Sequence, residues 1–216
     1  MSGLPTSASV ATALAGGKLH APSADRNVGP IVEMLRNVAP AKGRALEIAS
    51  GTGQHVLAMA RALPDIDWHP TEVAPDRIAS IDAYAAEAAL PNLHPARSLD
   101  AATTGWAAAH TPYDLIYLGN LLHLIPTPPA ETVLTEAAKA LTRQGMLILY
   151  GPFRRAGALT SEGDIKFDAE LRAANPAIGY KDDTWVKEVL TSAGLTLSLH
   201  DMPANNLAFI ASRSTP

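Results

Sequence analysis

A glycine-containing turn after a short apolar segment constrains the fold of this chain more than any other feature. The segment Ala45-Leu46-Glu47-Ile48 is mostly apolar, as expected of a buried strand, and the apolar residues from Val56 to Leu63 recur at helical spacing. Residues 50 to 54 therefore lie between a strand and the start of a helix, where open α/β sheets bind nucleotides. Gly51 and Gly53 have no Cβ, so the backbone can turn sharply there and approach a ligand closely.

Apolar segments alternate with helical patterns along most of the chain. The predicted strands cover residues 45–48, 66–72, 93–99, 113–120, 146–150, 195–200 and 206–212. The predicted helices cover residues 30–39, 56–63, 76–89, 129–141, 167–174 and 183–193. Such alternation is typical of a doubly wound parallel sheet with right-handed crossovers, but no helix separates the last two strands. We therefore expect an α/β, Rossmann-like, mostly parallel seven-stranded sheet with an antiparallel last strand.

The length and composition fit one folded domain. The chain has 216 residues, of which 47% are hydrophobic, enough for one sizeable core. Residues 1–22 are rich in small residues and are predicted to form a flexible N-terminal arm, either disordered or settled over a ligand. Residues 23–216 are predicted to form the domain. Within it, residues 151–183 are too long for a simple connection and are predicted to form a lid.

Composition also argues against several classes of function. The formal net charge is −4 and no long basic cluster occurs, so we expect no double-stranded nucleic acid partner. The chain has no cysteine, which excludes disulfides and thiolate zinc sites and is compatible with a cytoplasmic location. No histidine pair has zinc-site spacing, so no metal is expected. No apolar segment approaches the roughly 18 residues of a membrane span, so no membrane partner is expected.

Residues 47–56 can be compared with three kinds of nucleotide-binding loop, of which two are considered first. A phosphate-binding P-loop needs a Gly-Lys pair, which is absent here. The dinucleotide pattern Gly-x-Gly-x-x-Gly is half met, because Val56 occupies the third glycine position. Glu72 follows the glycines by about 20 residues, the spacing at which a carboxylate contacts a ribose, so an NAD-type oxidoreductase remains an alternative.

Several segments together resemble the DUF938 family of class I S-adenosylmethionine-dependent methyltransferase-like proteins, which includes the methyltransferase-like 26 proteins. The first matching segments are Ser23-Ala24-Asp25-Arg26-Asn27 and Leu46 to His55, where Ala49 replaces the first glycine of the methyltransferase motif. Later matches are Tyr150-Gly151-Pro152-Phe153, Phe167-Asp168 with Leu171-Arg172, and Met202-Pro203-Ala204-Asn205-Asn206. Family members usually have Asn-Met-Ile-His-Ile and then a Pro-Trp pair, whereas this chain has Asn120-Leu121-Leu122-His123-Leu124 and lacks the tryptophan.

The resemblance implies S-adenosyl-L-methionine as the cofactor and methyl transfer as the reaction. The cofactor-binding candidates are Arg26, Glu47, Ala49, Ser50, Gly51, Gly53, Glu72, Asp100 and Asn120. The substrate-binding candidates are Asn27, His55, Asn205 and Asn206. The catalytic candidates are His123 and Tyr150, which follow or end the predicted strands 113–120 and 146–150.

Each catalytic or acceptor-side candidate also has a structural alternative. His123 could be a partly buried histidine at a helix start, and Tyr150 could belong to the core with its hydroxyl satisfied. Asn205 and Asn206 could serve a turn. A cofactor-binding protein without catalysis is therefore a further alternative. The predicted lid favours a small polar acceptor, whose identity and acceptor atom the sequence leaves open together with the oligomeric state.

Overall fold

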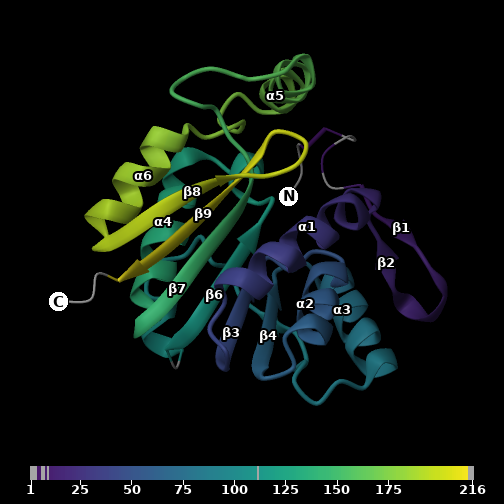
Figure 1. Ribbon diagram of the computed structural model, residues 1–216. Coiled ribbons are helices and arrows are strands. Elements are labelled where there is room, and N and C mark those ends of the chain that lie inside the picture. The colour runs from purple at the N-terminus through teal and green to yellow at the C-terminus, as the bar shows by residue number, and fades with distance from the viewer. Residues whose placement is uncertain (1–3, 6–7, 9, 111, 214–216) are drawn as a thin grey trace. The chain divides into compact units, whose positions relative to one another are not determined.

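A computed structural model describes residues 4–5, 8, 10–110 and 112–213. Its strands form a seven-stranded sheet in the order β5-β4-β3-β6-β7-β9-β8 (Figure 1). β3 (Gly43–Ile48), β4 (Ile66–Glu72), β5 (Arg97–Ser98) and β6 (Tyr113–Gly119) pair in parallel. β9 (Asn206–Arg213) is antiparallel to both β7 (Leu141–Pro152) and β8 (Leu195–Asp201). The predicted fold class, with an antiparallel last strand, is confirmed.

The chain divides into two compact units. The first, which we call the glycine-loop unit, comprises Ser9–Asp100 and Tyr113–Leu118. Its helices are α1 (Pro22–Val38), α2 (Gln54–Ala62) and α3 (Pro75–Ala88). α2 and α3 pack against β4, and α1 packs against α2. The fully buried side chains of Leu46, Trp68 and Leu115 place its core around the parallel strands.

The second unit, which we call the lid unit, comprises Met1–Ala8, Ala101–Pro112 and Gly119–Pro216. It contains the short helices η2 (Trp106–Ala109) and η3 (Leu122–Leu124) and the helices α4 (Thr127–Lys139), α5 (Glu162–Ala174) and α6 (Asp183–Ser192). α6 packs against β8 and α4, and α4 also packs against β7. α5 lies in the segment between β7 and α6 that the sequence predicted to be a lid (Figure 1).

Several predicted elements have different bounds in the structure, among them the first helix and the third strand. The first helix begins at Pro22 rather than Pro30, so Asp25, Arg26 and Asn27 lie inside it. Pro22 starts α1 because its fixed φ suits the first turn, and the interior Pro30 is tolerated within the longer helix. The strand predicted over residues 93–99 is reduced to Arg97–Ser98 and one isolated bridge between Leu93 and Trp68, because Pro95 lacks the N–H that a strand needs.

The N-terminal arm also contains more structure than its composition predicts. β1 (Thr12–Ala13) and β2 (Leu19–His20) pair as an antiparallel hairpin around η1 (Ala15–Gly17). The N–H of Leu14 donates to the carbonyl of Lys18, which closes the turn. Met1–Gly3, residues 6–7 and Ser9 lie outside the described residues. Contacts within the glycine-loop unit, rather than local propensity, stabilise this hairpin.

Candidate functional site

The glycine loop, residues 49–53, connects β3 to α2 with three residues of positive φ. These are Ala49 at 54°, Gly51 at 60° and Gly53 at 95°. A Cβ at Gly53 would lie 3.0 Å from the Cα of Ile81, so glycine is required there by the packing of α3. A Cβ at Gly51 would meet only the tip of Arg77, at 3.5 Å. Packing therefore leaves more room at Gly51 than at Gly53.

Glu72, at the end of β4, holds the glycine loop by a hydrogen bond to its backbone. Its Oε2 accepts a hydrogen bond from the N–H of Gly51 at 3.0 Å, and its Oε1 accepts from Val73 at 2.8 Å and Ala74 at 3.4 Å. The side chain is 3% exposed. The sequence predicted a ribose-binding acid at this position, and the structure gives the same carboxylate a structural role as well. A carboxylate has about four acceptor positions, so one more partner is possible.

Glu47, in β3 at the start of the loop, has a buried and incompletely paired carboxyl group. The residue is 2% exposed, and its Oε2 has no hydrogen-bond partner among the described residues. Burial raises the pKa of Glu47 to about 8; the hydroxyl of Ser50 opposes this rise and the negative charge of Glu72 adds to it. The carboxyl is thus mostly protonated at neutral pH, and a positively charged ligand group would favour its ionised form.

Ser50 and Thr71 hold the backbone around Glu47. The hydroxyl of Thr71 donates to the carbonyl of Glu47 at 2.7 Å, and the N–H of Ser50 donates to the carbonyl of Thr71 at 2.8 Å. The hydroxyl of Ser50 accepts from the N–H of Thr71 at 3.2 Å. The predicted site residue Ser50 therefore joins β3 to β4, and its side chain is already engaged.

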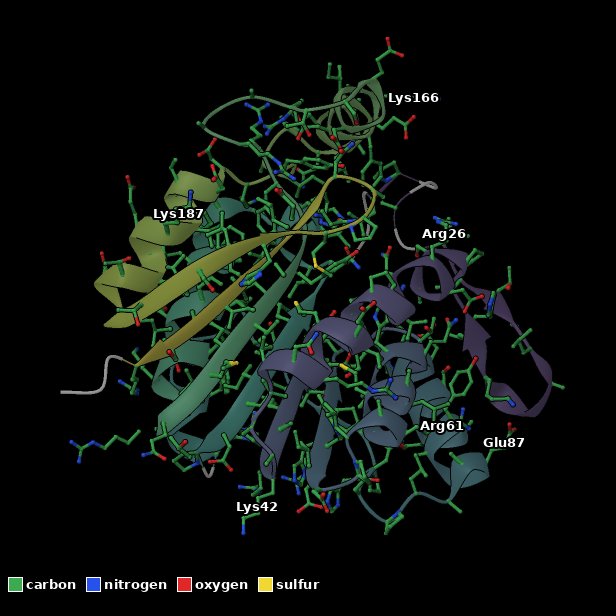
Figure 2. The ribbon with its side chains drawn as sticks, viewed as in Figure 1. Arg26, Lys42, Arg61, Glu87, Lys166 and Lys187 are labelled. Atoms are coloured by element: carbon green, nitrogen blue, oxygen red, sulfur yellow. The ribbon has the colours of Figure 1, made fainter. Side chains whose placement is uncertain are left out.

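The remaining candidates of the glycine-loop unit differ in exposure. Arg26 is exposed at the N-terminal end of α1 (Figure 2). Asn27 is half-buried in the same helix, whereas Asp100 is exposed after β5. A hydrogen bond to the backbone of Ala24 holds His55, and its buried Nε2 has no partner among the residues that the structure describes. Burial lowers the pKa of His55 to about 4, so the ring is neutral at physiological pH.

In the lid unit, Asn120 and Tyr150 lie side by side on neighbouring segments. The N–H of Asn120 donates to the carbonyl of Tyr150 at 2.9 Å, and Asn120 has a positive φ of 55°. Tyr150 is 3% exposed, and burial raises its pKa to about 12. The phenol is protonated at neutral pH and can donate a hydrogen bond, but it is a poor base.

His123 lies in η3 against aromatic residues of the lid. Its ring is 5.8 Å from Phe167 and 6.0 Å from Tyr180, measured between ring centroids. The residue is 6% exposed. Burial lowers the pKa of His123 to about 3, and the positive charge of Lys181 lowers it further. The ring is neutral at physiological pH but is a weak proton acceptor, which favours the structural alternative. Its catalytic role stays a prediction.

The two asparagines before and within β9 belong to the β8–β9 turn. Asn205 is exposed and has a positive φ of 59°. Asn206 is buried, and its Nδ2 donates to the carbonyl of Pro203 at 2.9 Å. Both observations fit the turn role that their residue type favours, and neither tests substrate binding.

Comparison with known proteins supports the methyltransferase-like fold. The family model described as "Protein of unknown function (DUF938)" matches residues 18–213. The chain belongs to the DUF938 family. An O-methyltransferase family protein from Burkholderia thailandensis matches with a TM-score of 0.75 at 16% identity, covering 87% of this chain and 56% of that one. A putative O-methyltransferase from Nostoc punctiforme has a TM-score of 0.72 at 19% identity, covering 85% and 54%.

A third solved structure matches at a similar level. PigF with SAH matches this DUF938 protein with a TM-score of 0.70 at 17% identity, covering 86% of this chain and 55% of that one. At such identities the likeness establishes the fold. The DUF938 chain spans a little more than half the length of these solved proteins.

Several residues of this DUF938 protein that the sequence did not single out shape the two units. Gln54 and Ser80 bind the glycine loop to the N-terminal hairpin, and Lys181 lies in the lid unit close enough to affect His123. Ser80 carries no pattern that would distinguish it from any helical serine. Gln54 directly follows the glycines, so its position next to the loop could have been a signal.

One buried carboxylate holds the segment of the DUF938 protein between β7 and α6. Asp168 in α5 accepts from the N–H of Tyr180 at 2.7 Å, from Arg172 Nε at 2.8 Å and from Arg154 Nη2 at 3.1 Å. Burial opposes its ionisation, but these hydrogen bonds outweigh burial and hold the pKa of Asp168 below its usual value. α5 is therefore fixed to both ends of the segment 154–180.

Two further kinds of feature were sought in the described part of the chain. Among residues 4–5, 8, 10–110 and 112–213, no group of three or more acidic, histidine or cysteine side chains is arranged to hold a metal ion. Within the same ranges, every helix is too short or too polar to cross a membrane.

Proposed function

We propose that this protein is an S-adenosylmethionine-dependent methyltransferase that acts on a small polar acceptor. The observation that carries the proposal is the carboxyl group of Glu47, which is buried beside the glycine loop and whose Oε2 has no hydrogen-bond partner within the described part of the chain. A buried polar atom without a partner costs about 1–3 kcal/mol, and a ligand that supplies a donor or a positive charge would remove this cost. S-adenosylmethionine carries both an ammonium and a sulfonium group.

The residues of the glycine-loop unit fit such a donor. Glu47 would face the positively charged methionine end, which would pass close to the backbone of Gly51. Glu72 has an acceptor position left for a ribose hydroxyl, and Asp100 would accept a hydrogen bond from the adenine amino group. The wider proposed set is Arg26, Ala49, Ser50, Gly53 and Asn120. The likeness to PigF with SAH supports this assignment at the level of the fold.

The cofactor supplies an electrophilic methyl group, so the protein mainly has to orient the reactants and exclude water. In the lid unit, Tyr150 is protonated and can donate a hydrogen bond to an acceptor, while Asn120 offers an amide beside it. We retain His123 as the candidate base and Asn27, His55, Asn205 and Asn206 as acceptor contacts. The ordered lid around Asp168 favours a small acceptor over a folded macromolecule.

Calorimetry tests the donor assignment. The purified protein is titrated separately with S-adenosylmethionine, S-adenosylhomocysteine and NAD, and the same titrations are made with Glu47→Gln. We expect binding of both sulfur ligands by the wild type and weaker binding by the variant. Affinity for NAD without affinity for either sulfur ligand would favour the oxidoreductase alternative.

Transfer of labelled methyl groups tests catalysis and the acceptor. The protein and labelled S-adenosylmethionine are incubated with separate small-molecule, protein and RNA fractions of a cell extract. We expect label in the small-molecule fraction, reduced by Tyr150→Phe and His123→Ala. Label confined to macromolecules would contradict the small acceptor. Donor binding without transfer to any fraction would favour the non-catalytic alternative.

A further inference from the structure

Gln54, the first residue of α2, joins three segments of the glycine-loop unit through one side chain. Its Oε1 accepts hydrogen bonds from the N–H of Ala21 at 2.7 Å and from the hydroxyl of Thr52 at 2.8 Å. Its Nε2 donates to Oδ1 of Asp25 at 2.6 Å. Both ends of the amide are therefore engaged, one with the loop and the start of α1, the other with the first turn of α1.

The network continues from Asp25 to the hairpin. Oδ2 of Asp25 lies 2.5 Å from Nε2 of His20, the last residue of β2. The chain His20, Asp25, Gln54 and Thr52 thus runs without interruption from the hairpin to the glycine loop. Asp25 is exposed and His20 is half-buried, so burial does not force these two groups to pair.

A second connection runs parallel to the first through a buried serine. The hydroxyl of Ser80 in α3 accepts from the N–H of Leu19 at 2.7 Å and donates to the carbonyl of Thr52 at 2.8 Å. The hairpin is further bound to α3 by the ion pair of Lys18 with Glu87 and by the hydroxyl of Tyr84, which donates to the carbonyl of Leu19 at 3.1 Å. Figures 1 and 2 show the hairpin beside α3, with Glu87 near it.

We propose that Gln54 is a positioning residue of the donor site: it fixes the N-terminal segment from His20 to Asp25 against the glycine loop, so that the loop presents its backbone to the donor in one geometry. The inference rests on the proposed function and adds the hairpin to the site. It also implies that this part of the arm is a fixed part of the site, because Gln54 and Ser80 bind it at two points.

The glycine loop needs such support because its own sequence allows many backbone conformations. Gly51 and Gly53 lose more conformational entropy on folding than other residues, and Ala49 has an unfavourable φ. Hydrogen bonds on both sides of Thr52 restrict that freedom: the hydroxyl is held by Gln54 and the carbonyl by Ser80. Binding a ligand to an already ordered loop saves the entropy of ordering it.

Exchange of donor and acceptor between two residues provides the sharpest test. Gln54→Glu keeps both accepted hydrogen bonds but replaces the donor to Asp25 by a second carboxylate. Asp25→Asn then restores a donor facing that carboxylate while keeping an acceptor for His20. We expect Gln54→Glu to raise the Kd for S-adenosylhomocysteine about tenfold, a loss of about 1.4 kcal/mol, and the double variant Asp25→Asn/Gln54→Glu to recover most of it.

Control variants and a measurement without ligand complete the design. Gln144→Ala makes the same truncation as Gln54→Ala at an exposed position outside the network and is expected to leave the Kd unchanged. Hydrogen exchange of the unliganded protein should accelerate at Ala21 and at residues 51–53 in Gln54→Ala but not in Gln144→Ala. This second measurement does not depend on the identity of the ligand.

The outcomes separate the two proposals. Unchanged affinity in Gln54→Ala, or failure of the double variant to recover affinity, would overturn the positioning role, the latter because a direct ligand contact would not be restored by a change at Asp25. If the wild type binds neither sulfur ligand, the proposed function fails. In that case, equal hydrogen-exchange rates in Gln54→Ala and the wild type would also reject the connection between the N-terminal segment and the glycine loop. Faster exchange in Gln54→Ala would support that connection.

Discussion

The backbone N–H of Gly51 donates to Oε2 of Glu72 at 3.0 Å, joining the glycine loop to the end of the neighbouring strand. The same carboxylate accepts from Val73 and Ala74, so it holds the turns that follow both β3 and β4. Glu47, in the neighbouring strand, has the opposite environment, with a buried oxygen that lacks a partner among the described residues. Of these two acids, one shapes the loop, and the other is the one that we propose to face the methyl donor.

Glu72→Gln should therefore destabilise the fold. An amide can keep one accepting oxygen, but its NH₂ group would face backbone N–H donors that would lose their partner. Each buried donor left unsatisfied costs about 1–3 kcal/mol, so we expect the free energy of unfolding to fall by about that amount. Urea denaturation at pH 7 measures it. Glu131→Gln, at an exposed position of α4, is the matched control, and an equal loss in both variants would contradict the prediction.

Glu47→Gln should instead affect stability in a pH-dependent way. The folded-state pKa is raised to about 8 from 4.5, so this residue's contribution to stability is complete below pH 4.5 and is lost as the pH rises to 8. The loss is about 1.4 kcal/mol per pH unit, and the glutamine variant does not share it. We expect the variant to gain stability relative to the wild type between pH 5 and pH 8. A constant difference between the two proteins over that range would reject the raised pKa.

Gly53→Ala should cost more stability than Gly105→Ala, although both glycines have nearly the same backbone conformation. Their φ angles are 95° and 88°, so the conformational strain is similar. The Cβ at Gly53 would lie 3.0 Å from the backbone of Ile81, whereas nothing lies within 4 Å at Gly105. We expect the free energy of unfolding to fall by about 1 kcal/mol in Gly105→Ala, and by about 1–3 kcal/mol more in Gly53→Ala, by analogy with overpacked cores. Thermal denaturation compares them, and equal losses would exclude the steric term.

The difference between these two glycines also marks the limit of what the sequence predicted. The strand, turn and helix pattern was sufficient for the fold, because the apolar period and the position of Gly51 and Gly53 are local signals. The pattern assigned both glycines to the ligand, whereas the packing of α3 accounts for Gly53. Contacts such as that of Ser80 with Leu19 join chain segments far apart in sequence, so no local sequence pattern predicts them. The early start of α1 was missed for a related reason, since Pro30 is a breaker by propensity but is tolerated within the longer helix.

Ala49→Gly should stabilise the protein or leave its stability unchanged. Ala49 replaces a glycine of the methyltransferase motif and has a φ of 54°, which costs a residue with a Cβ about 1–2 kcal/mol. Glycine removes that cost but increases the entropy of the unfolded chain by roughly 0.4–1 kcal/mol. The net expected change is a gain of about 0–1.6 kcal/mol. Ala60→Gly, inside α2, serves as the control and should lose about 1 kcal/mol; a comparable loss in Ala49→Gly would contradict the strain.

Three buried histidines should make the protein lose stability in mild acid. Burial lowers the pKa values of His55 and His69 to about 4 and that of His123 to about 3. These rings stay neutral in the folded state while the unfolded chain binds protons near pH 6.5, so their contribution is complete above pH 6.5 and is lost as the pH falls towards 4. Each ring changes the free energy of unfolding by about 1.4 kcal/mol per pH unit in this range. Above pH 4.5, Glu47 contributes a slope of the same size and opposite sign, which offsets one of the three histidines.

His69 allows this effect to be isolated. After burial, the neighbouring His94, Arg44 and Arg97 lower its pKa further, whereas Asp67 opposes them. Its ring stacks on that of His94 with centroids 4.2 Å apart, so protonation would place a charge against the His94 ring. We expect His69→Gln to reduce the slope of unfolding free energy between pH 6.5 and pH 4.5 by about one proton, or about 1.4 kcal/mol per pH unit. His200→Gln, on the exposed side of β8, is the control. Urea denaturation at half-unit pH intervals gives both slopes, and an unchanged slope in His69→Gln would show that this ring titrates normally in the folded protein.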